Sequence, residues 1–128
     1  MGDLKSYADG DRLWVALENQ KPAGFAVVDT YGSYVHLAEL DVDPLFMRRK
    51  IGSQLVMQTI DWSRKNGFRA MSLRTFSNTI WSMALYQGLG FRPCTKELAH
   101  LYPLIEAEKA MGLPIQNRLT LVLELDTH

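Results

Sequence analysis

The feature that most restricts how this chain can fold is a change in hydrophobic period near residue 50. Before it, residues 12–18, 23–29 and 34–42 form short runs rich in β-branched and aromatic side chains, with turn-forming residues between them. Such runs predict an antiparallel meander of three strands. After it, residues 51–65 carry apolar side chains at helical spacing, and the pattern stops at Asn66-Gly67, a typical helix end. We therefore expect a helix soon after the third strand.

The rest of the chain continues to alternate between strands and helices. The sequence predicts a strand over 68–75, a helix over 79–87, a short strand from Phe91, helical spacing over 97–111 and a final strand over 118–125. A strand, a helix and a second strand in succession imply a right-handed parallel crossover. With 128 residues and a mass of 14.6 kDa, the chain has the size of one domain. The expected fold class is α/β or α+β, with one mixed sheet in the order β-β-β-α-β-α-β-α-β.

Composition and charge argue against several classes of partner. Fourteen Lys and Arg residues balance fourteen Asp and Glu residues, so no overall positive charge favours nucleic acid. No apolar run reaches the ~18 residues that span a bilayer, so no membrane partner is expected. The single cysteine, Cys94, cannot form an internal disulfide and the N-terminus does not resemble a signal peptide, so we expect a cytoplasmic protein. Cys94, His100 and His128 lack metal-ligand spacing, and no metal is predicted.

The segment 42–55 carries the strongest indication of chemistry. A strand leaves through a short loop and enters a helix, whose first turn has unpaired N–H groups and a partial positive charge. Arg48, Arg49 and Lys50 add basic side chains, and Gly52 lets the backbone approach a ligand closely. This arrangement predicts a diphosphate site, and a solvated basic surface is the alternative. Neither a Walker loop nor a G-x-G-x-x-G dinucleotide fingerprint is present.

Three motifs resemble those of the GNAT acyltransferase superfamily. Val42-Asp43-Pro44 is similar to the V-x-P of its fourth strand, and residues 47–52 (MRRKIG) stand where the family has [QR]-x-x-G-x-[GA]. Residues 85–91 (LYQGLGF) are similar to L-Y-x-x-x-G-F, which closes the following helix. Met47 and Lys50 depart from the second motif, Lys50 by replacing its first glycine.

The resemblance covers residues 12–125 and implies a GNAT-like fold, a mixed and mostly antiparallel central sheet with a β-α-β crossover and flanking helices. It implies that residues 1–128 form one domain lacking most of the usual N-terminal strand and the two helices after it. The implied activity is direct transfer of an acetyl group from acetyl-coenzyme A to a primary amine of a small molecule or peptide. The alternative is a catalytically degenerate acyl-coenzyme A-binding or interaction module. Because a shortened domain can leave apolar surface uncovered, a homodimer is also considered.

The resemblance further implies roles for individual residues. Tyr86 is expected to protonate the departing thiolate as a general acid, and a packed structural tyrosine is the alternative. Near Leu40 to Val42 the third strand is expected to splay from its parallel neighbour, so that its N–H groups bind pantetheine and polarise the thioester carbonyl. The residues expected to bind the cofactor are Leu40, Val42, Arg48, Arg49, Lys50, Ile51, Gly52, Ser53 and Ser82.

Two residues of the third strand are candidates for the base that deprotonates the amine. Strict alternation would place His36 and Leu40 on one face of the sheet. Glu39 and Asp41 would then lie on the other face, so His36 and Glu39 cannot both point into one site. His36 ranks first because imidazole titrates near neutrality and family members resemble this strand with a His or Glu at its position; a buried sheet histidine is the alternative. Glu39 is expected to support the sheet or bind the amine, and Glu39, Asp41 and Asp43 suggest a cationic acceptor or a solvated edge.

Overall fold

The computed structural model of the protein describes residues 3–7, 12–45, 50–76, 80–96, 98–113 and 118–125. Its elements are, in chain order, β1 (Asp3–Tyr7), β2 (Leu13–Glu18), β3 (Lys21–Tyr31), β4 (Tyr34–Val42), α1 (Ile51–Lys65), β5 (Ala70–Phe76), α2 (Ile80–Gly88), β6 (Arg92–Pro93), the short 3-10 helix η3 (Ala99–Leu101), α3 (Tyr102–Ala110) and β7 (Arg118–Glu124). The six predicted strands and three predicted helices are all present. Strand β1 is additional, because its sequence DLKSY is short and mostly polar and gives no clear strand pattern.

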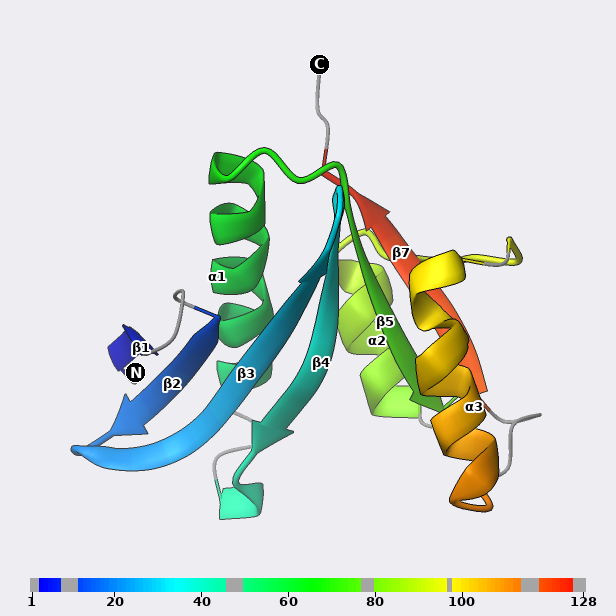
Figure 1. Ribbon diagram of the computed structural model, residues 1–128. Helices are drawn as coiled ribbons and strands as arrows, with labels where there is room; N and C mark the ends of the chain where they lie inside the picture. Colours follow the sequence, from blue (N-terminus) through cyan, green and yellow to red (C-terminus); the bar gives the residue numbers. More distant parts are fainter. Residues whose placement is uncertain are drawn as a thin grey trace.

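The strands form one seven-stranded sheet in the order β1-β2-β3-β4-β5-β7-β6. Neighbouring strands are antiparallel except β4 and β5, which run parallel and are joined by α1. The predicted mixed sheet and parallel crossover are therefore confirmed. Figure 1 shows the sheet with α1 and α2 behind it and α3 in front of the β5–β7 part.

Helix α1 forms because its apolar residues recur on one side, and this side packs against β2, β3 and β4. Leu55 and Val56 are fully buried there, and Trp62 makes an edge contact with Trp14 of β2 at 5.6 Å between ring centroids. The helix ends where expected, since Gly67 has a φ of 80°, the left-handed conformation that glycine adopts without strain. This packing against the sheet also places the start of α1 beside the end of β4.

Strand β4 contains a one-residue bulge that the sequence pattern does not reveal. In the ladder with β3, Val28 lies opposite Leu37 and Val27 lies opposite Glu39, which leaves Ala38 without a partner. An unpaired extra residue of this kind shifts the alternation of all side chains after it.

The bulge corrects the prediction about the faces of β4. Residues directly opposite one another in a ladder share a face. His36 lies opposite Asp29, and Glu39 lies opposite Val27, two residues before Asp29 and therefore on the same face of β3. Leu40 lies opposite Ala26, which is buried with α1. His36 and Glu39 therefore share the face away from α1, and Leu40 lies on the other. The expected grouping of His36 with Leu40 against Glu39 is wrong, because it assumed strict alternation through Ala38.

The parallel strands β4 and β5 separate after their first three residues. They pair only at Tyr34–Ala70, Val35–Met71 and His36–Ser72. In Figure 1 the two strands lie together near their starts and diverge toward their ends, with α2 behind the gap. The predicted splay is present and begins before Leu40, directly after His36.

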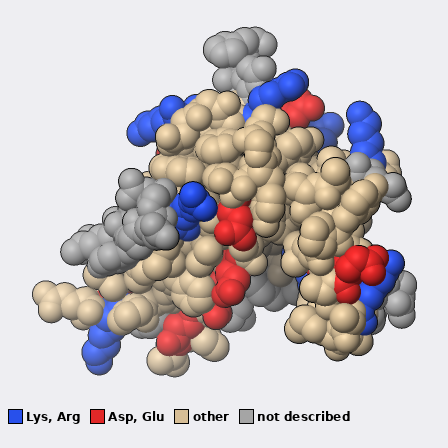
Figure 2. All heavy atoms as spheres, viewed as in Figure 1, with Lys and Arg blue, Asp and Glu red and all other residues tan. Residues whose placement is uncertain are grey.

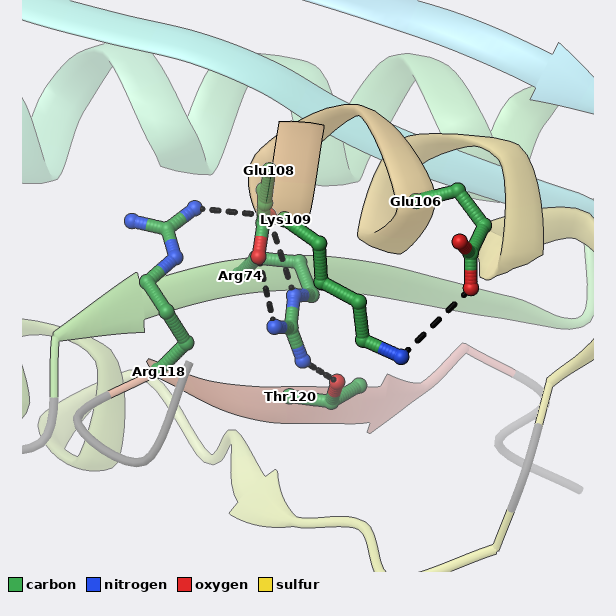
Figure 3. Close-up of polar contacts among 6 residues, drawn as sticks. All are labelled: Arg74, Glu106, Glu108, Lys109, Arg118 and Thr120. Atoms are coloured by element: carbon green, nitrogen blue, oxygen red, sulfur yellow. Dashed lines mark hydrogen bonds and ion pairs between the residues drawn. The ribbon is translucent and has the colours of Figure 1, made fainter. Parts of the chain in front are cut away.

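Helix α3 is fixed to β5 and β7 by a buried carboxylate, Glu108, between two arginines (Figure 3). The Arg74 guanidinium donates to Glu108 at 2.7 and 3.2 Å and also to the Thr120 hydroxyl at 2.8 Å, and Arg118 donates to Glu108 at 3.0 Å. Burial alone would raise the pKa of Glu108, but these hydrogen bonds outweigh it and keep the pKa below its usual value. The exposed pair between Lys109 and Glu106 contributes little by comparison.

Candidate active site

Where β4 and β5 diverge, they enclose with α2 a cleft of about 370 Å³. Tyr86 and Ser82 of α2 line it together with Glu39 and Leu40 of β4, so four of the predicted site residues meet in one place. The full lining is Leu37, Ala38, Glu39, Leu40, Asp41, Leu73, Arg74, Thr75, Phe76, Ser82, Tyr86 and Arg118. His36 is not part of it, although it lies on the same face of β4 as Glu39.

Tyr86 is positioned by the end of α2 and by the chain that follows. The Phe91 N–H donates to the Tyr86 carbonyl at 3.0 Å, and the Phe91 ring meets the Tyr86 ring edge-on at 5.7 Å. Gly90 makes this return possible with a φ of 101°, which explains the glycine of the 85–91 motif. Burial raises the pKa of Tyr86 to about 12, which makes its hydroxyl a weaker acid than a free tyrosine but keeps it protonated at neutral pH, as a proton donor must be.

Glu39 and Asp41 are exposed carboxylates on the β4 side of the cleft. Both belong to the part of β4 that follows the bulge and no longer pairs with β5. An exposed carboxylate can attract an ammonium group and accept its proton. Glu39 therefore has the position that a base in this cleft requires.

His36 lies instead in a buried polar cluster between β4, β5 and η3. The Ser72 hydroxyl bridges His36 Nδ1 at 2.8 Å and His100 Nε2 at 3.0 Å. The His100 ring also packs against Tyr34, at 4.7 Å between centroids, and stacks on Tyr31 at 5.2 Å. Burial, with a smaller contribution from His100 and Arg74, lowers the pKa of His36 to about 4. Its contacts with Ser72 enclose the imidazole away from the cleft lining, which makes a structural link its simplest role.

The helix start at Lys50 and Ile51 has the properties of the predicted diphosphate site. Lys50 precedes the helix with a φ of 61°, so the position where the family has glycine is in the left-handed conformation here. The N–H groups of Ile51, Gly52 and Ser53 belong to the first turn, where no helical carbonyl pairs with them. Ile51 is buried, and the Lys50 side chain is exposed. Arg48 and Arg49 lie outside the described residues.

This helix start lies directly against the cleft wall. A Cβ at Gly52 would meet side-chain atoms of Val42 at 3.6 Å, Leu85 at 3.7 Å and Leu40 at 3.9 Å, and Leu40 lines the cleft. The donors that coenzyme A requires for its diphosphate, free backbone N–H groups near basic side chains, are therefore next to the space for its acyl end. The residues present fit this co-substrate.

The cleft also contains two arginines that the sequence analysis did not select. Arg74 lies within β5, and Arg118 lies at the start of β7 with its guanidinium 4.6 Å from the centre of the Phe76 ring. Both are partly neutralised by Glu108, and both line the cleft. Arg74 is the one charged residue in the β5 sequence AMSLRTF, and this is the sequence signal that could have indicated it.

In the part of the chain that the structure describes, no group of three His, Cys, Asp or Glu side chains is arranged to hold a metal ion. Among these same residues, no helix is both long and apolar enough to cross a membrane.

Comparison with known sequences agrees with this geometry. The profile described as "Acetyltransferase (GNAT) family" matches residues 2–91. The [ribosomal protein bS18]-alanine N-acetyltransferase of Escherichia coli K12 is 30% identical over 101 residues, which are 77% of this chain and 68% of that protein. An uncharacterized N-acetyltransferase of Methanocaldococcus jannaschii is 30% identical over 90 residues, 65% of this chain and 40% of that protein.

Solved structures share the fold. The crystal structure of the ribosomal-protein-S18-alanine N-acetyltransferase from Escherichia coli superposes with a TM-score of 0.71 at 21% identity, covering 94% of this chain and 74% of that chain. The PaiA N-acetyltransferase of Thermoplasma acidophilum, solved in complex with coenzyme A, has a TM-score of 0.69 at 14% identity and covers 88% and 59%. From the family match and the shared fold, the chain belongs to the GNAT acetyltransferase family and is an N-acetyltransferase that uses acetyl-coenzyme A as its co-substrate.

Proposed function

We propose that the cleft between β4 and β5 is where an acetyl thioester and a primary amine react directly, without an acyl-enzyme. The observation that carries this proposal is the meeting of Tyr86, a buried proton donor, with the exposed carboxylate of Glu39 in one cleft beside the start of α1. Holding both reactants there would supply much of the rate acceleration.

The cofactor end of the site uses mainly backbone groups. The N–H groups of Ile51, Gly52 and Ser53 bind the diphosphate, and the basic side chains of Arg48, Arg49 and Lys50 add charge-assisted contacts. Backbone N–H groups around Leu40 and Val42, in the part of β4 that has left β5, bind the pantetheine arm and polarise the thioester carbonyl, and the Ser82 hydroxyl adds a polar contact from α2. Acetyl-coenzyme A supplies the acetyl group.

At the reacting end, Tyr86 is the general acid and Glu39 is the general base. The ammonium group of the acceptor first gives one proton to solvent, which frees the nitrogen lone pair to attack the thioester carbonyl. Glu39 takes the second proton from this nitrogen as the amide bond forms and then releases it to solvent. The Tyr86 hydroxyl donates its proton to the sulfur as the carbon–sulfur bond breaks, and it is reprotonated by solvent. His36, ranked first on sequence grounds, is replaced by Glu39 because its imidazole is engaged by Ser72 and lies outside the cleft lining.

A protein or peptide amino terminus is the acceptor class that we favour. The bacterial relative at 30% identity is named for acetylating an alanine of ribosomal protein bS18. The exposed carboxylates of Glu39 and Asp41 would attract the ammonium group of such a terminus.

A thiol-release assay with acetyl-coenzyme A and a panel of amines and peptides tests the function. We expect release of free coenzyme A that depends on the acceptor, with a matching mass increase of one acetyl group on the product. Thermal stabilisation by acetyl-coenzyme A without thiol release for any acceptor would instead support the alternative, a degenerate acyl-coenzyme A-binding module.

We also propose that the protein works in the cytoplasm. Its single cysteine, Cys94, is a free thiol, which suits a reducing compartment. The homodimer considered above stays a prediction, and sedimentation at several protein concentrations tests it.

A further inference from the structure

A second cavity lies next to the catalytic cleft, on the β2–β3–β4 part of the sheet. Its volume is about 670 Å³ and its walls are mostly apolar. The residues that line this acceptor groove, as we name it, are Leu13, Val15, Pro22, Ala23, Gly24, Phe25, Asp41, Val42, Asp43 and Pro44. Neither Tyr86 nor Ser82 takes part in it, so it is distinct from the space for the acyl end of the cofactor.

The acceptor groove opens on the sheet face opposite α1. Leu13 and Val15 alternate along β2 with Trp14 and Ala16, which are buried against α1, so they point the other way. Phe25 lies opposite Asp41 in the β3–β4 ladder and shares that face. Leu13, Val15 and Phe25 are only half-buried. An apolar floor is therefore available to a partner from outside the chain.

The lining of the acceptor groove carries negative charge. Asp41 and Asp43 are the charged residues in the lining of the acceptor groove, and Glu39 follows on the same side of β4. Figure 2 shows acidic side chains in a row down this face, over β4, with a basic side chain beside the upper end of the row. A second copy docking through the same face would bring these carboxylates against one another. A cationic partner with apolar side chains is complementary to it.

The acceptor groove and the cleft adjoin at Asp41, which lines both. Between Glu39 and Asp43 an extended strand covers roughly 13 Å, the length of about four residues of an extended peptide. An amine held at Glu39 would thus place the next few residues of its own chain along the apolar floor.

We propose that the acceptor groove selects the acceptor: it binds the first residues of an extended peptide amino terminus that carries an apolar and a basic side chain within about four residues of the amine. This inference rests on the proposed function and adds the surface that holds the peptide and the side chains that this surface prefers. Small primary amines fill only the cleft and lack these contacts.

Two matched peptides test the proposal, both beginning with alanine. One continues with leucine, arginine and lysine, and the other with serine, glutamate and glutamine. For the unaltered protein we expect kcat/KM to be about tenfold or more higher for the basic apolar peptide. The double variant Asp41→Asn/Asp43→Asn should reduce this ratio about fivefold, mainly through KM, because each exposed charge pair contributes modestly. Asn at position 43 retains the oxygen that accepts from the Leu45 N–H at 2.9 Å.

The matched control is Asp61→Asn, which removes an exposed carboxylate from α1, and its ratio should equal that of the unaltered protein. Equal kcat/KM for both peptides, or an unchanged ratio in the double variant, would overturn the proposal.

A binding measurement separates this proposal from the proposed function. If no acceptor is acetylated, the proposed function fails, and the acceptor groove is then tested by fluorescence anisotropy with a labelled basic apolar peptide. A fivefold weaker Kd in Asp41→Asn/Asp43→Asn than in Asp61→Asn would support the groove, and equal Kd values would refute it. A stable dimer that blocks the peptide and dissociates on Phe25→Arg would assign this face to a second copy and also refute it.

Discussion

Residues 34–36 of β4 pair with β5 and are buried or half-buried, whereas residues 39–41 have left β5 and line a cleft. Each part carries a titratable side chain on the same face of the sheet. His36, in the first part, is enclosed, bonded to Ser72 and held neutral, while Glu39, in the second, is exposed. The distance along a diverging strand, and not only the face, therefore decides which group can reach a substrate.

Ala38 separates the two parts. Its bulge lets Glu39 and Asp41 appear on the face of His36, and it coincides with the region where β4 leaves β5. Bulges often re-aim side chains next to active sites. In the proposed function, the same strand supplies a structural link in its first part and carboxylates for an amine in its second.

The largest expected effect is on kcat, when Tyr86, the proposed proton donor on the α2 side of the cleft, is replaced. Tyr86→Phe should lower kcat by about 10²–10⁴, because the departing thiolate loses its proton source, while the Kd for coenzyme A changes less than about twofold. Thiol release and calorimetry measure the two quantities. Tyr34→Phe, in the paired part of β4, is the matched control and should retain kcat. Equal losses of kcat and cofactor affinity in Tyr86→Phe would make Tyr86 structural.

His36, in the part of β4 that pairs with β5, should make the free energy of unfolding depend on pH. The pKa of His36 is about 4 in the folded protein and near 6.5 in the unfolded chain, so the unfolded state binds more protons between these values. Stability is full above pH 6.5 and falls on acidification toward pH 4, by on the order of 3 kcal/mol. Urea unfolding from pH 7.5 to 4.5 measures the decrease. His36→Asn, which can keep the bond to Ser72, should reduce the slope, and an unchanged slope would refute the assignment.

Replacing Glu39 and His36 in turn tests whether the open part of β4, and not its paired part, supplies the base. Glu39→Gln should lower kcat/KM by about a hundredfold through loss of the base, with little change in the unfolding midpoint. His36→Asn should leave kcat/KM within about threefold, because His36 does not line the cleft. Steady-state kinetics on the two purified variants decides, and the reverse order of losses would restore His36 as the base.

A smaller effect is expected where β3 supports the open part of β4. A Cβ on Gly24 would lie 2.6 Å from the Asp41 carbonyl oxygen, so Gly24→Ala must displace β4. We expect a loss of about 1–3 kcal/mol in the free energy of unfolding, typical of overpacking. Gly88→Ala is the control, since nothing lies within 4 Å of a Cβ there. Equal free energies of unfolding for the two variants would show that β4 can move away from the new Cβ without destabilising the fold.

The smallest effect is expected at the helix start beside this open part. Lys50 has a left-handed φ of 61°, which costs a side chain about 1 kcal/mol relative to glycine. Lys50→Gly should therefore raise the free energy of unfolding by up to about that amount in urea titrations. Destabilisation would indicate that the Lys50 side chain makes contacts that offset the strain.

Much of the fold follows from local patterns. The apolar spacing of residues 51–65 and the glycine at position 67 predict α1 and its end, and the order of strand, helix and strand predicts the parallel crossover. The bulge at Ala38 has no such pattern, because alanine suits either face and the shift appears only in pairing with β3. Glu108 likewise finds Arg74 across 34 residues of chain, a contact that no local pattern encodes.

For the site, motif and structure contributed different parts. Tyr86, Ser82, Glu39 and Leu40 could be selected from the sequence, and they line one cleft. The ranking of His36 above Glu39 could not be resolved, because it depends on burial and on where β4 and β5 stop pairing. The acceptor groove combines side chains of β2, β3 and β4, and only their register brings these together.

A crystal structure of the protein with coenzyme A would show directly whether the cleft holds the co-substrate. We expect the diphosphate on the N–H groups of Ile51, Gly52 and Ser53, the pantetheine arm between β4 and β5, and the sulfur within hydrogen-bonding distance of the Tyr86 hydroxyl. Coenzyme A bound away from this cleft, or a helix start blocked by the Lys50 side chain, would contradict it.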